Sequence, residues 1–191
     1  MKKLYVIAGC NGAGKTTASY SVLPELLGCE QFVNADEIAK GLSPFNPEKA
    51  AIQAGRIMLD RIKSLINNNE TFAFETTLST KSHANIIKTA QASGYEVSLL
   101  FFWLNHEDLA KKRVEIRVKE GGHNIPPDVI SRRYKRGLWN FFCIFIDIVD
   151  DWMFVNNSGM DYEIIAEGAK SDINIMNPIL WNDIKRNCDE K

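Results

Sequence analysis

One glycine-rich segment near the N-terminus constrains the fold of this 191-residue chain more than any other feature. Residues 9–16 fit the pattern G-x-x-x-x-G-K-[ST]; they are Gly9, Cys10, Asn11, Gly12, Ala13, Gly14, Lys15 and Thr16. An apolar run at residues 4–8 precedes the segment, and a helical pattern follows it as far as Pro24. A strand, a glycine-rich loop and a helix in this order predict a phosphate-binding loop, or P-loop.

The residue types of the loop explain its chemistry. Glycines let the backbone turn so that successive N–H groups point at a polyphosphate, and the following helix adds the positive end of its dipole. The Lys15 ammonium reaches the terminal phosphates, and the Thr16 hydroxyl suits Mg²⁺. We therefore expect residues 9–16 and Thr17 to bind the nucleotide, with ATP and Mg²⁺ as cofactors.

Size and composition predict one soluble domain over residues 1–191. A hydrophobic content of 45% and a charged content of 25% are typical of globular proteins, and a net charge of −1 gives no overall attraction to nucleic acid or membrane. The most apolar stretch, residues 138–155, is interrupted by polar residues, so we expect no membrane span. The four scattered cysteines, without an export signal, indicate a cytoplasmic protein and no cysteine-based metal site.

Strand and helix patterns alternate along the chain, which predicts an α/β fold with helices on both faces of the sheet. The expected strands include residues 4–8, 31–34, 71–74 and 96–104. The expected helices include residues 47–67, 81–92, 106–119 and 127–148. The predicted fold class is a P-loop NTPase with a mostly parallel five-stranded sheet and a helical lid.

Two acidic residues follow predicted strands, at the edge of the sheet where ligands of parallel sheets bind. Asp36 can take a proton from an acceptor hydroxyl, or it can cap the helix that begins near Glu37. Glu75 can hold Mg²⁺ or bind the hydroxyls of an acceptor. Thr76 and Thr77 follow, either as substrate contacts or as caps of the next segment.

The segment 111–136 holds nine basic and three acidic residues, a net charge of +6 in a near-neutral chain. Arg113 and Arg117 are four residues apart and therefore share one helix face. Arg132 and Arg133 lie beyond a glycine-containing connection, so the segment resembles a lid that closes over the triphosphate. A solvated helical surface explains the lysines of the same segment. The predicted catalytic residues are Lys15, Asp36, Arg113, Arg117, Arg132 and Arg133.

Taken in order, four motifs resemble the zeta toxin family of small P-loop kinases, over residues 3–160. These motifs are the P-loop, Asn34-Ala35-Asp36-Glu37, Phe74-Glu75-Thr76-Thr77, and the two arginines of the first lid helix with residues 121–126. The resemblance implies ATP-dependent phosphorylation of the 3′-hydroxyl of a UDP-N-acetyl amino sugar. It implies Asp36 as base, Glu75 and Thr77 as substrate contacts, and an antitoxin protein as a candidate partner.

The chain departs from the family pattern in ways that leave the acceptor open. Cys10 stands where the family loop commonly has proline, and could be sensitive to oxidation or simply a tolerated small residue. His123 stands where longer toxins carry an arginine, so Arg132 or Arg133 would supply that charge. Residues 156–158 are placed to contact adenine. Two alternatives remain, a nucleic-acid end kinase, against which the near-neutral charge argues, and an NTP-binding regulatory ATPase.

Overall fold

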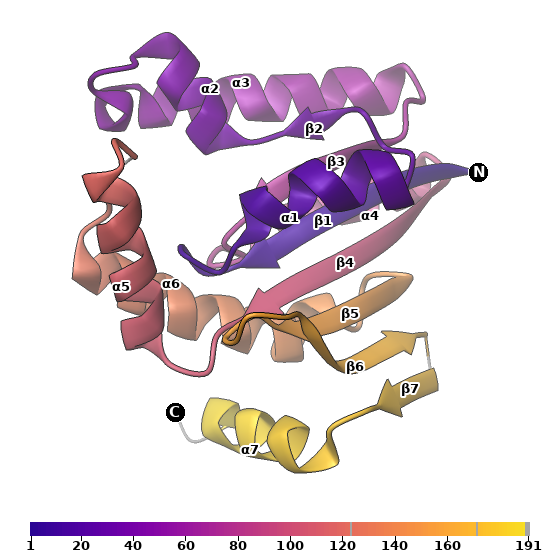
Figure 1. Ribbon diagram of the computed structural model, residues 1–191. Coiled ribbons are helices and arrows are strands. Elements are labelled where there is room, and N and C mark those ends of the chain that lie inside the picture. Colours follow the sequence, from indigo (N-terminus) through magenta and orange to yellow (C-terminus); the bar gives the residue numbers. More distant parts are fainter. Residues whose placement is uncertain (123, 171, 190–191) are drawn as a thin grey trace.

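A computed structural model describes residues 1–122, 124–170 and 172–189. Its centre is a seven-stranded sheet with the order β2-β3-β1-β4-β5-β6-β7 (Figure 1). The parallel strands are β2 (Phe32–Val33), β3 (Phe72–Thr76), β1 (Lys2–Gly9), β4 (Tyr95–Trp103) and β5 (Asp151–Asn156). β6 (Glu163–Ala169) and β7 (Asp172–Ile175) extend the sheet as antiparallel strands. The prediction of five strands is therefore wrong in number, although the parallel part has five.

The helices confirm the alternating α/β pattern. They are α1 (Lys15–Ser21), α2 (Ala35–Leu42), α3 (Pro47–Asn67), α4 (His83–Ala92), α5 (Glu107–Lys119), α6 (Pro127–Asn140) and α7 (Pro178–Asp189), with π-helical turns at Val22–Leu26 and Phe141–Phe145. The helical path after the P-loop does not stop at Pro24, because α1 continues directly into a π-helical turn that includes this proline. Among the described residues, no helix is long and apolar enough to cross a membrane.

Helices cover both faces of the sheet, as the sequence predicts (Figure 1). One face packs against α3, α4, α7 and the end of α6, and the other packs against α1, α5 and the start of α6. β4 contributes alternately to both, since Leu99 and Phe101 join the first core and Phe102 joins the second. A central strand buried on two sides explains the nearly continuous apolar run in its sequence.

Aromatic packing fixes the end of α6 against the sheet. Phe141 lies 4.8 Å from Phe101 and 5.1 Å from Phe154, measured between ring centroids. Trp152 stacks on Trp181 of α7 at 5.5 Å. The predicted helix 127–148 is α-helical only to Asn140 and continues as a π-helical turn over Phe141–Phe145, whose phenylalanine side chains are buried in the core.

The middle of α6 is anchored to the chain just after β3. A Cβ atom on Gly137 would lie 2.5 Å from the Thr77 carbonyl oxygen, so only glycine allows this approach. One turn further on, the buried Asn140 amide donates a hydrogen bond to the Leu78 carbonyl at 2.7 Å. These contacts hold α6 beside the strand end that carries Glu75.

We predict that Gly137→Ala lowers the free energy of unfolding by about 1–3 kcal/mol, because the added methyl group forces the α6 backbone away from Thr77. Gly55→Ala is the matched control within α3. Its Cβ would meet nothing within 4 Å, so it should stabilise the protein by about 0.4–1 kcal/mol. Urea denaturation followed by tryptophan fluorescence measures both changes. Shifts of the same sign in the two variants would contradict the close contact.

Candidate active site

The P-loop is shaped by tight contacts at its two ends. Gly9 and Gly14 have φ angles of 139° and 82°, which side chains rarely adopt. A Cβ on Gly9 would collide with the Phe102 carbonyl oxygen of β4. At the other end, the Asn157 side-chain amide crowds Gly14 and donates a hydrogen bond to the Ala13 carbonyl at 2.8 Å. The loop is therefore held on one side by β4 and on the other by the chain after β5.

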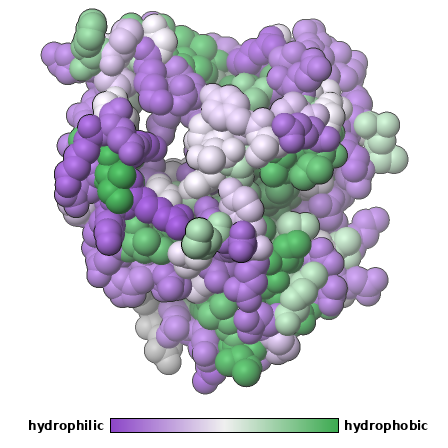
Figure 2. Space-filling model, in the orientation of Figure 1, coloured by the Kyte–Doolittle hydropathy of each residue, from purple (hydrophilic) through white to green (hydrophobic). Residues whose placement is uncertain are grey.

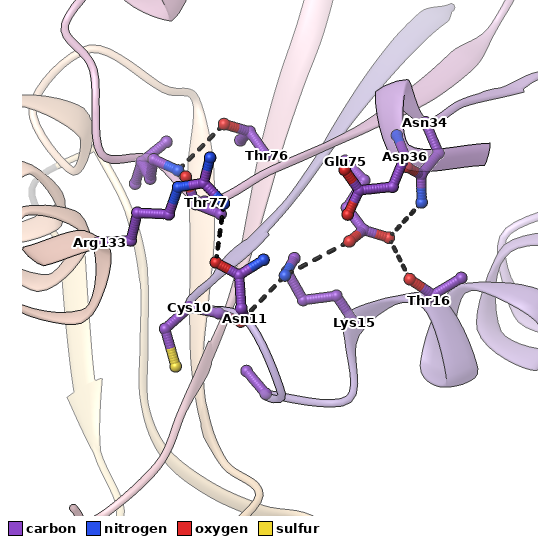
Figure 3. Close-up of polar contacts among 12 residues, drawn as sticks. Cys10, Asn11, Lys15, Thr16, Asn34, Asp36, Glu75, Thr76, Thr77 and Arg133 are labelled. Atoms are coloured by element: carbon purple, nitrogen blue, oxygen red, sulfur yellow. Dashed lines mark hydrogen bonds and ion pairs between the residues drawn. The ribbon is translucent and has the colours of Figure 1, made fainter. Parts of the chain in front are cut away.

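The Glu75 carboxylate is the centre of the polar contacts in the site (Figure 3). One of its oxygens accepts hydrogen bonds from the Thr16 hydroxyl at 2.7 Å and from the Asn34 amide at 2.9 Å. The other oxygen lies 3.3 Å from Lys15 Nζ, which also donates to the Cys10 carbonyl at 3.0 Å. The Lys15 and Glu75 side chains are only 5% and 10% exposed. Three elements, the P-loop, the end of β2 and the end of β3, therefore meet at one carboxylate.

Asn34 rather than Asp36 caps α2. The Asn34 side-chain oxygen accepts hydrogen bonds from the backbone N–H groups of Asp36 at 2.8 Å and Glu37 at 3.4 Å. Asp36 therefore does not cap the helix, as one of its two predicted roles required, but lies in the first turn of α2. Asparagine is among the most favoured N-cap residues, so this signal was present in the sequence.

A first cavity, of about 300 Å³, lies along the P-loop and the inner side of α5. Its lining residues are Asn11, Gly12, Gly14, Lys15, Thr16, Thr17, Asp36, Glu75, Arg113 and Arg117. The structure thus brings both arginines of the first lid helix to the predicted phosphate site. Gly9, Cys10 and Ala13 belong to the loop but are buried within it. On the surface, polar side chains surround a hollow between the region of α2 and α3 and that of α5 (Figure 2).

A second cavity, of about 190 Å³, adjoins the first. Its lining residues are Asn11, Lys15, Asn34, Ala35, Asp36, Met58, Glu75, Thr76, Thr77, His83 and Arg133. Four residues line both cavities, namely Asn11, Lys15, Asp36 and Glu75. A molecule in the second cavity would therefore share its floor with the terminal phosphate of a nucleotide in the first. A larger cavity of about 680 Å³ lies elsewhere, over β4 to β7, and contains none of the predicted site residues.

The structure separates the two neighbouring arginines of α6. Arg133 donates a hydrogen bond to the Asn11 side-chain oxygen at 3.1 Å and lines the second cavity (Figure 3). Burial lowers the pKa of its guanidinium, while the Asp36 carboxylate acts in the opposite direction. Arg132 is exposed and lines neither cavity, so the geometry gives no support to its predicted catalytic role.

The threonines after Glu75 differ in their contacts. The buried Thr76 hydroxyl accepts a hydrogen bond from the Leu78 N–H at 3.0 Å, as a local cap does. The Thr77 hydroxyl pairs with the Ser79 hydroxyl at 2.9 Å. Both residues line the second cavity, so a substrate contact by Thr77 stays a prediction.

Other predicted features have mixed outcomes. Asn157 binds the P-loop, and the contact of residues 156–158 with adenine stays a prediction. In the segment 111–136, Val114 and Ile130 are buried, so both of its helices are packed on the second core. His123 lies outside the described residues, and the closure of the segment over the phosphates also stays a prediction.

The donor set near Glu75 suits a hard cation. The Thr16 hydroxyl and the Glu75 carboxylate are both oxygen ligands, which Mg²⁺ prefers, and they lie 2.7 Å apart. Among residues 1–122, 124–170 and 172–189, no group of three or more His, Cys, Asp or Glu side chains gathers as a metal site. Mg²⁺ usually takes only one or two protein ligands beside substrate phosphates and water, so this set fits a nucleotide-bound ion.

Sequence comparison assigns the family. The sequence profile described as Zeta toxin matches residues 1–143, most of the chain. A protein of Haemophilus influenzae (strain ATCC 51907 / DSM 11121 / KW20 / Rd), described as uncharacterized, is 34% identical over 140 residues, which is 70% of this chain and 98% of that protein. The chain belongs to the zeta toxin family.

Solved structures with little sequence identity share the fold. A structure of AvrRxo1-ORF1:AvrRxo1-ORF2 with sulphate ions matches with a TM-score of 0.77 at 17% identity, covering 96% of this chain. The present chain spans only 63% of that protein chain. A structure from the PezAT chromosomal toxin-antitoxin system of Streptococcus pneumoniae matches with a TM-score of 0.68 at 14% identity, covering all of this chain and 85% of that one. These likenesses show that the chain shares its fold with both structures.

We predict that Cys10 resists alkylation in the folded protein. Burial raises the pKa of its thiol to about 11, although the nearby Lys15 charge acts in the opposite direction. At pH 8 only about one molecule in a thousand then carries the reactive thiolate, a fraction that grows as the pH approaches 11. Mass spectrometry after iodoacetamide treatment should find Cys143, which is exposed, modified much faster than Cys10. Equal rates would contradict the buried loop and favour the oxidation-sensitive alternative.

Proposed function

We propose that this protein is an ATP-dependent phosphotransferase that moves the γ-phosphoryl group onto a hydroxyl of a small acceptor. The observation that carries the proposal is the pair of adjoining cavities with a common floor of Asn11, Lys15, Asp36 and Glu75. A nucleotide in the first cavity and an acceptor in the second cavity would meet at these residues. Such positioning supplies much of the catalysis in phosphoryl transfer.

The residues have distinct roles in this proposal. The negative charge of the phosphates is compensated by Lys15, Arg113 and Arg117, since all three line the first cavity. Asp36 lines both cavities, and it therefore accepts the proton of the attacking hydroxyl. Arg133 joins the P-loop to the acceptor side through Asn11.

Mg²⁺ fits beside Thr16 and Glu75, where the ion would neutralise charge on the phosphates. The Lys15–Glu75 ion pair keeps the lysine in the site until a nucleotide binds. The proposed use of ATP leads us to place the protein in the cytoplasm.

The resemblance to zeta toxins makes a UDP-N-acetyl amino sugar the first acceptor to test. An antitoxin protein is the proposed partner, supported by family membership and by the likeness to a structure from a toxin-antitoxin system. Nucleic acid is a less favoured acceptor because the chain is near neutral as a whole.

We predict that Asp36→Asn lowers transfer from ATP to the acceptor by about 10²–10⁴-fold, because the amide cannot accept the hydroxyl proton. ATP affinity should change little, since the P-loop contacts remain. Incubation of radiolabelled ATP with a panel of UDP-sugars, sugars and nucleosides, followed by chromatography, measures the transfer.

The matched control is Asp60→Asn, which makes the same change on the exposed side of α3. It should transfer at the wild-type rate. Unchanged transfer in Asp36→Asn would refute the assignment of the base. Slow ATP hydrolysis by the wild type, without any phosphorylated acceptor and with nucleotide-dependent protein association, would instead favour the regulatory ATPase.

A further inference from the structure

The wall of the second cavity opposite the P-loop contains a histidine that sequence reasoning did not single out. His83, the first residue of α4, lines this cavity. Its ring stacks on Phe74 of β3, with centroids 5.7 Å apart and planes inclined by 18°. Phe74 is fully buried, so the imidazole rests on a rigid aromatic base.

The contacts of the ring leave one nitrogen for a ligand. His83 Nδ1 lies 3.2 Å from the Thr80 hydroxyl, and this local interaction occupies that side of the ring. Burial lowers the pKa of His83, which keeps the imidazole neutral near pH 7. A neutral ring whose Nδ1 is engaged has Nε2 available for a hydrogen bond with a molecule in the cavity.

The size of the cavity restricts what can enter. Its volume of about 190 Å³ lies below the range of about 300–1,000 Å³ typical of pockets that enclose a drug-sized ligand. A single six-membered ring with its substituents is compatible with this space, whereas a complete nucleotide sugar would have to leave its nucleotide part outside.

The charges of the lining favour an uncharged group. The positively charged lining residues are Lys15 and Arg133, and the negatively charged ones are Asp36 and Glu75. The two positive and two negative side chains give the lining no net charge, which suits an uncharged acceptor group. Hydroxyl-bearing and amide side chains supply the remaining polar lining, as recognition of ring hydroxyls requires.

We propose that His83 determines acceptor specificity by a hydrogen bond from its Nε2 side to the group of the acceptor that enters this cavity. The proposal rests on the phosphotransferase function and adds a specificity-determining residue to it.

Two substitutions of His83 test the proposal because each retains one side of the ring. His83→Gln places an amide group near the position of Nε2, whereas His83→Asn places one near Nδ1. With N-acetylglucosamine, its 1-phosphate and UDP-N-acetylglucosamine as acceptors, His83→Asn should raise the acceptor KM roughly five- to tenfold. His83→Gln should raise it by about twofold or less. The KM for ATP should not change, because His83 does not line the first cavity, where the nucleotide is proposed to bind.

His106→Asn is the matched control, since His106 is exposed and lines neither cavity. Asparagine also preserves its role as the N-cap of α5. Transfer by the wild type together with the same acceptor KM in all three histidine variants would overturn the role of His83. The absence of transfer to any acceptor would contradict the proposed function itself, and with it this inference.

A second measurement on the wild-type protein does not depend on the stability of the variants. Addition of N-acetylglucosamine to the protein with bound ADP should move the ring-proton NMR signal of His83 in a saturable way, while that of His106 stays constant. Saturable transfer to the sugar without a change in the His83 signal would overturn the proposal.

Discussion

The buried Glu75 carboxylate is the interaction on which the rest of the site depends. It joins the lysine and threonine of the P-loop to the asparagine that caps α2. A buried charge is costly unless it is paired and hydrogen-bonded, and here an ammonium group, a hydroxyl group and an amide group share this task. The loss of any one partner would leave polar groups of the others unsatisfied. Three strand ends are therefore positioned by one side chain.

A second constraint sets the acceptor side. Gly137 and Asn140 fix α6 to the segment after β3, and the same helix presents Arg133 to Asn11 of the P-loop. The aromatic core beneath α6 stabilises this placement. The two cavities consequently adjoin as a result of the fold rather than of a flexible loop, which is what transfer between two bound molecules requires.

Local motifs predicted most of the fold, and long-range contacts account for what they missed. The P-loop and α3 depend on neighbouring residues, and their positions are confirmed. β7 was missed because it has only four residues, all of them exposed, although Ile173 and Ile175 alternate with polar residues. The Asn34–Glu75 bond spans 41 positions and the Asn11–Arg133 bond spans 122, so no spacing rule reveals them. Arg133, and not Arg132, lies on the face of α6 that carries Gly137 and Asn140. This spacing of four and three residues was visible in the sequence.

The central claim is that a nucleotide and an acceptor occupy adjoining cavities at the same time. A crystal structure with a non-hydrolysable ATP analogue and Mg²⁺ tests this most directly. The account predicts that the terminal phosphate lies among Lys15, Arg113 and Arg117, and that the cavity between Asp36 and His83 stays open beside it. A nucleotide whose phosphates fill that second cavity would contradict the account, because no acceptor could then reach the γ-phosphate.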